Sequence, residues 1–222
     1  MMLEMVGFLV IGALVVLLVV VLAFATRGGR KKALDAVREL AESRGWSFTV
    51  GPAHKKWTIT GSLSGVRFDA ECSRPQRHVG STQASRPFDT RLTAAVPGGG
   101  VLVEPVGFSK LPAFVRKGLA QTFGPNADSI RTSGSRLETL PTASKLPKRL
   151  DVWETTPGIA VKLLTEDVIA ALERFVGSSS PPVITWFDGT LQIVVGGNNT
   201  RAVDEKTFFE LAGAITEAAR KG

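Results

Sequence analysis

The sequence has few of the residues on which most catalytic mechanisms depend. It contains one cysteine, two histidines and no tyrosine in 222 residues. The single cysteine, Cys72, excludes an intramolecular disulfide and a cysteine-based zinc cluster. No HExxH, CxxC, GxSxG or EF-hand pattern occurs. We therefore predict no catalytic residues, no metal and no cofactor from sequence motifs.

Charge is also missing from one long stretch near the start of the chain. Residues 5–26, "MVGFLVIGALVVLLVVVLAFAT", form a run of 22 residues without a charged side chain. A helix of that length rises about 33 Å, slightly more than the hydrocarbon thickness of a bilayer. A signal peptide has a basic start and a shorter apolar segment, whereas Glu4 precedes this run. We predict that residues 1–26 are a single transmembrane anchor.

Two alternatives stay open for this segment. Ala23-Phe24-Ala25 has the A-x-A form of a signal-peptidase site, so cleavage after Ala25 would release a secreted protein. An apolar helix can also lie in the core of a soluble protein. The unbroken apolar circumference of the run favours the membrane anchor over both.

Cations follow the apolar run, and none precedes it. Arg27, Arg30, Lys31 and Lys32 lie in a predicted juxtamembrane linker, residues 27–32. Positive charge next to a span is typical of its cytoplasmic side, so we predict that the C-terminal part of the chain is cytoplasmic. The same four side chains are the predicted contacts to anionic lipid headgroups.

The remaining chain divides by charge and composition. Residues 27–149 hold 21 Lys and Arg against 9 Asp and Glu, while residues 150–222 hold 6 against 10. We predict a basic α+β lobe at 33–123, a Ser/Thr/Pro-rich connector at 124–149 and an acidic ββαββα lobe at 150–222. The connector either contains a short strand near residues 129–133 or is a flap. Whether the two lobes share one core is left open.

Turn signals and periodicity predict the elements of the first lobe. "RKKALDAVRELAESRG" predicts an amphipathic helix that ends at Gly45 and docks either on lipid or on the protein's own sheet. "WTITGSLSGVRFDAEC" predicts a hairpin whose second strand turns Cys72 inward, where a thiol packs rather than reacts. "FDTRLTAAVPGGGVLVEPV" predicts a second hairpin that reverses at residues 97–100.

The second lobe gives equally clear signals. "LDVWETTPGIAVKLL" predicts a hairpin that turns at residues 156–158, and Asp188-Gly189 predicts a type I′ hairpin. Helices are predicted at 165–177, with Thr165 as the N-cap, and at 204–221. Because helices fall between groups of hairpins, we predict an α+β fold with a mostly antiparallel sheet.

One polar loop is a candidate site for a small anion. In "SRPQRHVGSTQASRP", His78 lies among Arg74, Arg77 and Arg86, whose guanidinium groups suit a phosphate or a carboxylate. His54 is predicted to be an exposed loop residue. The pairs Glu166-Asp167 and Asp204-Glu205 begin predicted helices, where the helix dipole favours acidic side chains without any acid–base role. The Arg74–Arg86 loop is therefore the alternative site of function.

The sequence resembles a group of uncharacterised single-pass bacterial membrane proteins, many of them actinobacterial. The likeness covers most of the chain and rests on the order of "LAESRGWSF", "WTITGSLSGVRFDAE", "LDVWETTPGIAVKLLTEDVIAAL" and "ITWFDGTLQIVV" after an N-terminal span. It implies an anchor followed by an α+β domain, and it implies no activity and no site residues. The long connector departs from the group's pattern.

These observations predict a membrane-anchored, non-enzymatic module that binds a protein partner or acts as a scaffold at the cytoplasmic surface of the bilayer. The alternative is a small-anion-binding or hydrolytic domain with its site near residues 74–86. A calculated pI near 9.9 raises nucleic-acid binding as a third class. However, the cations are dispersed among acids and do not form a stripe, and no recognition helix or RNP-like motif occurs, so nucleic acid is not an expected partner.

Overall fold

The computed structural model describes residues 34–51, 56–73, 88–112, 126–138, 149–178, 181–197 and 204–222. The chain forms two compact units, residues 1–44 and 45–222. In the first unit, the described residues form a helix from Leu34 to Ser43 that buries Val37 and Ala41. Gly45 follows with φ +69°, a left-handed conformation that suits glycine at the end of a helix. The predicted amphipathic helix is confirmed.

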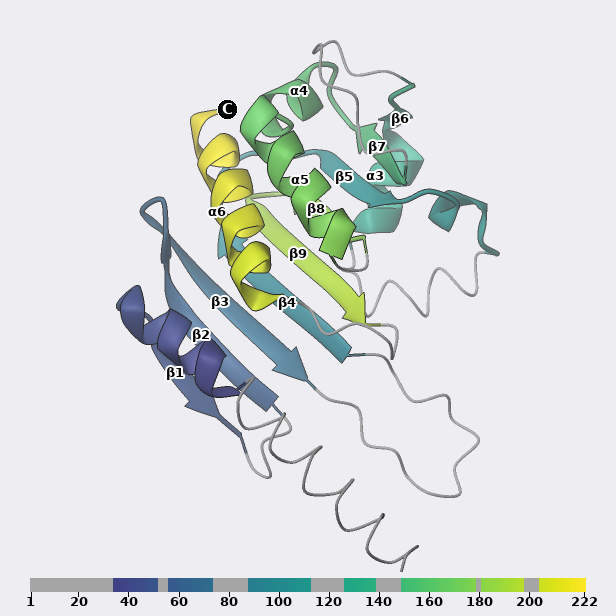
Figure 1. The fold of residues 1–222 in the computed structure, drawn as a ribbon. Helices are drawn as coiled ribbons and strands as arrows, with labels where there is room; N and C mark the ends of the chain where they lie inside the picture. The colour runs from purple at the N-terminus through teal and green to yellow at the C-terminus, as the bar shows by residue number, and fades with distance from the viewer. Residues whose placement is uncertain are drawn as a thin grey trace, which may run out of the picture. The chain divides into compact units, whose positions relative to one another are not determined.

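The strands described in the second unit form one antiparallel sheet in the order β1-β2-β3-β4-β9-β8-β5-β7-β6 (Figure 1). The strands are β1 (Ser47–Val50), β2 (Lys56–Leu63), β3 (Val66–Ser73), β4 (Phe88–Ala95), β5 (Val101–Pro105), β6 (Ser135–Arg136), β7 (Leu150–Glu154), β8 (Val183–Phe187) and β9 (Thr190–Gly197). The helices are η2 (Phe108–Lys110), α3 (Ala127–Ser133), α4 (Ile159–Leu163), α5 (Glu166–Ser178) and α6 (Glu205–Lys221). The predicted α+β class with an antiparallel sheet is confirmed.

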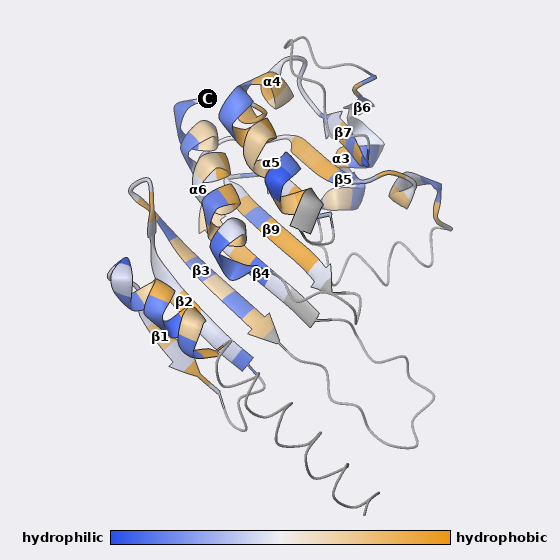
Figure 2. Ribbon diagram, in the orientation of Figure 1, coloured by the Kyte–Doolittle hydropathy of each residue, from blue (hydrophilic) through white to orange (hydrophobic). Residues whose placement is uncertain are grey.

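One face of the sheet is covered by α4, α5 and α6, and we call it the helix face (Figure 1). Phe68 of β3 lies on this face, because its ring packs against Phe209 of α6 at a centroid distance of 5.8 Å. Residues directly opposite each other in antiparallel strands share a face. The strand register therefore continues the helix face from Phe68 through Ala94, Leu191, Trp186 and Val101. Figure 2 shows apolar residues concentrated along β5 and β9, in the middle of this layer.

Aromatic side chains form the core between α6 and strands β2 and β3. Trp46 packs edge-on against Phe68 at 5.0 Å and lies 5.0 Å from Phe209. Its Nε1 donates to the carbonyl oxygen of Ser62 at 3.2 Å, which fixes the ring in its plane. The indole lies directly on Gly61, where an added Cβ would be 2.6 Å from Cγ of Trp46. Only glycine at position 61 leaves room for this ring.

The second face of the sheet is polar over β1, β2 and β3. Its side chains are the residues that alternate with the apolar ones. The exposed members are Ser47, Thr49, Lys56, Ser62, Arg67 and Asp69. Glu71 forms ion pairs with Lys56 and with Arg91 of β4 across neighbouring strands. This alternation is the pattern predicted for β3, and it leaves a charged but balanced surface.

The predicted hairpin between residues 88 and 105 is wrong. Strands β4 and β5 do not pair, because β9 and β8 lie between them. Residues 98–100 all have positive φ and run along the β8–β9 turn, with Gly100 N donating to the carbonyl of Trp186 at 2.6 Å. A Cβ at Gly99 would lie 2.7 Å from the backbone nitrogen of Phe187. The glycines therefore allow a close backbone crossing rather than a tight reversal.

The predicted strand after residue 158 is also wrong, since Ile159–Leu163 forms α4. The carboxylate of Glu154 accepts hydrogen bonds from the backbone N–H groups of Gly158 and Ala160, both at 3.0 Å. This contact satisfies N–H groups at the start of the helix, which have no partner within it. The acidic segment is consequently ordered strand, helix, helix, strand, strand, helix, and not ββαββα. A short apolar run such as "IAVKLL" fits either a strand or a buried helix.

A third correction concerns the connector, where Ala127–Ser133 forms α3 and not a strand. Several local predictions are confirmed. Asp188 and Gly189 have positive φ, as a type I′ turn requires, and β8 pairs with β9 across them. Thr165 accepts from Val168 N at 3.4 Å at the start of α5, and Asp204 accepts from Lys206 N at 3.1 Å at the start of α6.

Strands from both predicted lobes are interleaved in the single sheet. Strand β9 of the acidic segment pairs with β4 of the basic segment, and β8 pairs with β5. The two segments therefore share a core, which the sequence left open. The predicted span at residues 5–26 lies outside the described residues. Among the helices that are described, none has the length and apolar character needed to cross a membrane.

Candidate functional site

The residues predicted to bind an anion lie outside the described part of the chain. They are Arg74, Arg77, His78 and Arg86, and the predicted headgroup contacts Arg27, Arg30, Lys31 and Lys32 are outside it as well. The described strands end next to this loop, where Ser73 at the end of β3 pairs with Asp89 near the start of β4. The hypothesis of an anion site in this loop stays a prediction.

The thiol of Cys72 lies on the helix face, as predicted. The residue is 8% exposed and sits opposite Trp57 of β2 and Thr90 of β4 in the strand register. A thiol enclosed by a core is a poor nucleophile, because burial disfavours the thiolate. The structure therefore gives Cys72 a packing role.

The feature that most resembles a reaction centre is a pair of buried carboxylates. Glu104 of β5 and Asp151 of β7 are directly opposite each other in the register and are 0% and 5% exposed. Glu104 alternates with Val101 and Val103, so both acids lie on the second face of the sheet, away from the main helix layer. Paired carboxylates can act as a general acid and a general base, a role that depends on the partners of each carboxylate.

Glu104 has several hydrogen-bond donors around its carboxylate. Nε of Arg131, from α3, donates to both carboxylate oxygens at 3.0 and 3.1 Å, and Nη2 of the same guanidinium also contacts Oε2. Nε1 of Trp153 donates to Oε1 at 3.0 Å. A planar guanidinium matches a carboxylate in this fork geometry, so the buried charge of Glu104 is fully compensated.

The guanidinium of Arg131 also reaches a second acid. Nη1 donates to Oδ1 of Asp128 at 2.5 Å, one turn earlier in α3. Burial lowers the pKa of Arg131, but the hydrogen bond and the attraction of Glu104, and then those of Asp128, outweigh it. The pKa of Arg131 is therefore raised above its usual value, and the side chain is a permanent cation.

Asp151 is compensated by a different arginine. Nη2 of Arg136, from the edge strand β6, donates to Oδ1 of Asp151 at 2.5 Å. The side chain of Arg136 is 51% exposed, whereas that of Asp151 is 5% exposed. Each carboxylate of the pair thus has its own guanidinium partner, which removes the repulsion expected between two acids that face each other.

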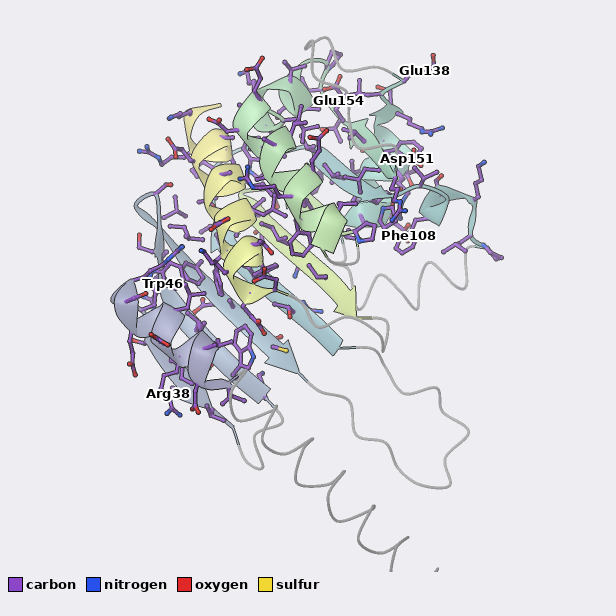
Figure 3. All side chains as sticks on the ribbon, in the orientation of Figure 1. Arg38, Trp46, Phe108, Glu138, Asp151 and Glu154 are labelled. Atoms are coloured by element: carbon purple, nitrogen blue, oxygen red, sulfur yellow. The ribbon has the colours of Figure 1, made fainter. Side chains whose placement is uncertain are left out.

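We call Glu104, Asp128, Arg131, Arg136 and Asp151 the ion cluster. It adjoins a small apolar core in which Ala127 and Ile130 of α3 pack with Leu102 and Val183. Figure 3 shows Asp151 and Phe108 at the β5–β7 end of the sheet, with Trp46 at the opposite end. The cluster and the small core together attach α3 and β6 to the second face.

The partners of Glu104 in the ion cluster do not suit an acid–base mechanism. Glu104 bonds the guanidinium of Arg131 and the indole N–H of Trp153, and neither donor is a group that accepts a proton in catalysis. No group of three or more His, Cys, Asp and Glu side chains suited to a metal ion occurs among the residues that the structure describes. The arrangement can hold an edge of the sheet together, and it offers no acid–base pair to a substrate.

The ion cluster is not predicted by any motif in the sequence. Glu104 stands alone in the apolar strand "VLVEPV", and a single acid in such a run is the one local signal that a buried partner exists. The partner, Arg131, lies 27 positions further on, in the segment treated as a connector. No spacing rule links these positions, because the sheet brings them together.

No protein-family description matches the sequence, and no curated protein is significantly similar to it.

Proposed function

We propose that this chain is a membrane-anchored, non-enzymatic module that binds a protein partner at the cytoplasmic surface of the bilayer. The observation that carries the proposal is the run of 22 uncharged residues at 5–26, followed by four cations at 27–32. Its length matches the hydrocarbon core, and the one-sided charge favours a cytoplasmic domain. The compact unit at residues 45–222 follows these cations closely along the sequence, which is compatible with the proposal.

Two features of the domain support binding over catalysis. The buried carboxylates of the ion cluster accept hydrogen bonds from arginine and tryptophan side chains of the same domain. The second face of β1, β2 and β3 presents exposed side chains of both charges together with serine and threonine. Charges on such a surface steer the approach of a partner and fix its orientation.

Alkaline carbonate extraction of membranes from cells that express the full chain tests the anchor. We expect the protein to stay in the membrane pellet, because peripheral proteins are released and spanning helices are not. Leu17→Arg combined with Val20→Arg should move most of the protein to the supernatant or prevent its insertion, since each central arginine costs about 3 kcal/mol. Thr26→Arg is the matched control and should be retained, because an arginine at the end of a span reaches the interface.

Two results would contradict the anchor. Release of the unaltered chain by carbonate would show that residues 5–26 do not span. A chain that begins at Thr26 in the medium, measured by intact mass, would show that the segment is a cleaved signal peptide. Either result would leave the fold unchanged and remove the proposed location.

A further inference from the structure

The turn between β8 and β9 contains a sequence that is prone to spontaneous chemical change. Asp188 is exposed, and Gly189 follows it directly. In an Asp-Gly sequence, the backbone nitrogen of the glycine can attack the side-chain carboxyl carbon, because glycine has no side chain that hinders the approach. The nitrogen loses its proton, a new N–C bond closes a succinimide ring, and one carboxyl oxygen leaves as water. Water then reopens the ring and leaves an isoaspartyl link.

Residues 96–100, which we call the strap, lie against this turn. The strap connects β4 to β5 in the sequence, and the β8–β9 hairpin lies between these two strands. Val96 N donates to the carbonyl of Gly189 at 2.9 Å, and Gly189 N donates to the carbonyl of Gly98 at 2.8 Å. Both backbone polar groups of Gly189 are thus bonded to the strap.

Further contacts hold the strap in place. Gly100 N donates to the carbonyl of Trp186 at 2.6 Å, and Thr155 N donates to the carbonyl of Gly100 at 2.8 Å. Nε1 of Trp186 donates to the carbonyl of Val96 at 3.1 Å. Val96 and Trp186 are both buried, so this end of the strap is attached to the core. The strap cannot leave the turn without breaking these hydrogen bonds.

We propose that the strap protects the Asp188-Gly189 sequence from isomerisation. The N–H group that donates to Gly98 is the same group that must lose its proton and attack the carboxyl carbon. The pairing of β8 with β9 on both sides of the turn further limits rotation of the backbone at Asp188. Ring closure therefore requires the strap to release Gly189 first. The rate of isomerisation then reports how often this part of the fold opens.

Incubation of the purified full chain at physiological temperature and pH tests the protection. The isoaspartyl content at position 188 is measured by mass spectrometry of proteolytic peptides, for the folded chain and for the same chain unfolded in guanidinium chloride. We expect isomerisation to be at least about ten times slower in the folded chain, because opening costs the two hydrogen bonds at Gly189. Equal rates in the two states would overturn the proposal. The protection does not depend on the membrane anchor, so failure of the carbonate test leaves it standing.

Two glycine substitutions separate the effect of the strap from the stability of the whole domain. A Cβ at position 99 would lie 2.7 Å from the backbone nitrogen of Phe187, so Gly99→Ala should displace the strap from the turn. Gly65→Ala is the matched control, because Gly65 also has positive φ but an added Cβ there would meet nothing within 4 Å. We expect Gly99→Ala to raise the rate at position 188 at least about fivefold and Gly65→Ala to leave it unchanged.

An equal rise in both variants would contradict the proposal, because the rate would then follow the stability of the whole domain. An unchanged rate in Gly99→Ala would contradict it as well. Asp188→Asn supplies a second measurement if Gly99→Ala does not fold, since Asn-Gly also favours a type I′ turn. Its side-chain amide leaves as ammonia in the same ring closure, which changes the intact mass. Deamidation at the same rate in the folded and unfolded forms of this variant would refute the protection.

Discussion

Replacing Arg131 with methionine should lower the free energy of unfolding by about 3 to 5 kcal/mol. Removing one partner of a buried ion pair leaves the other charge without compensation. Glu104 is 0% exposed and would keep only the indole N–H of Trp153. For a domain of this size, the loss corresponds to a fall of about 10 °C in the melting temperature, measured by circular dichroism.

Arg149→Met is the matched control for this substitution. Arg149 is exposed and adjoins β7, so the same change in side chain should alter stability by less than about 0.5 kcal/mol. Glu104→Leu combined with Arg131→Met should recover more than half of the loss, because apolar side chains replace both charges. Equal melting temperatures for Arg131→Met and Arg149→Met would show that the ion cluster does not hold α3 on the sheet.

Replacing Gly61 with alanine should destabilise the domain by about 1 to 3 kcal/mol, the usual cost of an extra methyl group in a filled core. The new Cβ would lie 2.6 Å from Cγ and 2.9 Å from Nε1 of Trp46. The indole cannot move aside freely, because Phe68, Phe209 and the Ser62 carbonyl all contact it. Chemical denaturation followed by tryptophan fluorescence would measure the loss.

Gly213→Ala makes the same chemical change with the opposite expected sign. Gly213 is inside α6, and an added Cβ would meet Cδ2 of Leu63 at 3.7 Å, an ordinary van der Waals distance. Alanine favours a helix more than glycine does, so we expect a gain of about 0.5 to 1 kcal/mol. If Gly61→Ala proved as stable as the unaltered chain, the packing of Trp46 on β2 would be wrong.

The sequence predicted those parts of the fold that depend on neighbouring residues. Asp188-Gly189 specifies its hairpin because a type I′ turn needs positive φ at both central residues. Alternation along β3 placed Phe68, Ala70 and Cys72 in the core. The N-cap Thr165 was predicted because a cap contact joins a side-chain oxygen to a backbone N–H only three residues further on. Asp204 was predicted only as an acidic residue at the start of a helix, and its carboxylate caps α6.

Strand order could not be predicted in the same way. Residues 97–100 look like a reversal, yet the β8–β9 hairpin, which lies about ninety residues further on, is inserted between β4 and β5. The choice depends on which strands bury their apolar faces together, and no local signal encodes that choice. The helix at Ile159–Leu163 was missed for a related reason, since the side chain of Glu154 stabilises a turn that the apolar pattern alone leaves undecided.

The candidate site could likewise be predicted only where its signal is local in the sequence. A lone acid at position 104 is visible in the sequence, but its partners Arg131, Trp153 and the facing Asp151 come from separate elements. In the structure, the carboxylate of Glu104 already accepts hydrogen bonds from Arg131 and Trp153. It therefore joins structural elements and does not serve as a proton acceptor. Because the buried carboxylates Glu104, Asp151 and Glu154 are all bonded to donors of the same domain, the proposed function depends chiefly on where the chain is located.

The most direct test of that location is the sidedness of the domain in membranes from cells that express the full chain. Ser62→Cys in a Cys72→Ala background places one exposed thiol on β2. If residues 45–222 are cytoplasmic, as we propose, a membrane-impermeant thiol reagent should label it in inside-out vesicles and not in intact spheroplasts. Labelling in spheroplasts, or recovery of the labelled domain from the medium, would contradict a cytoplasmic module held by residues 5–26.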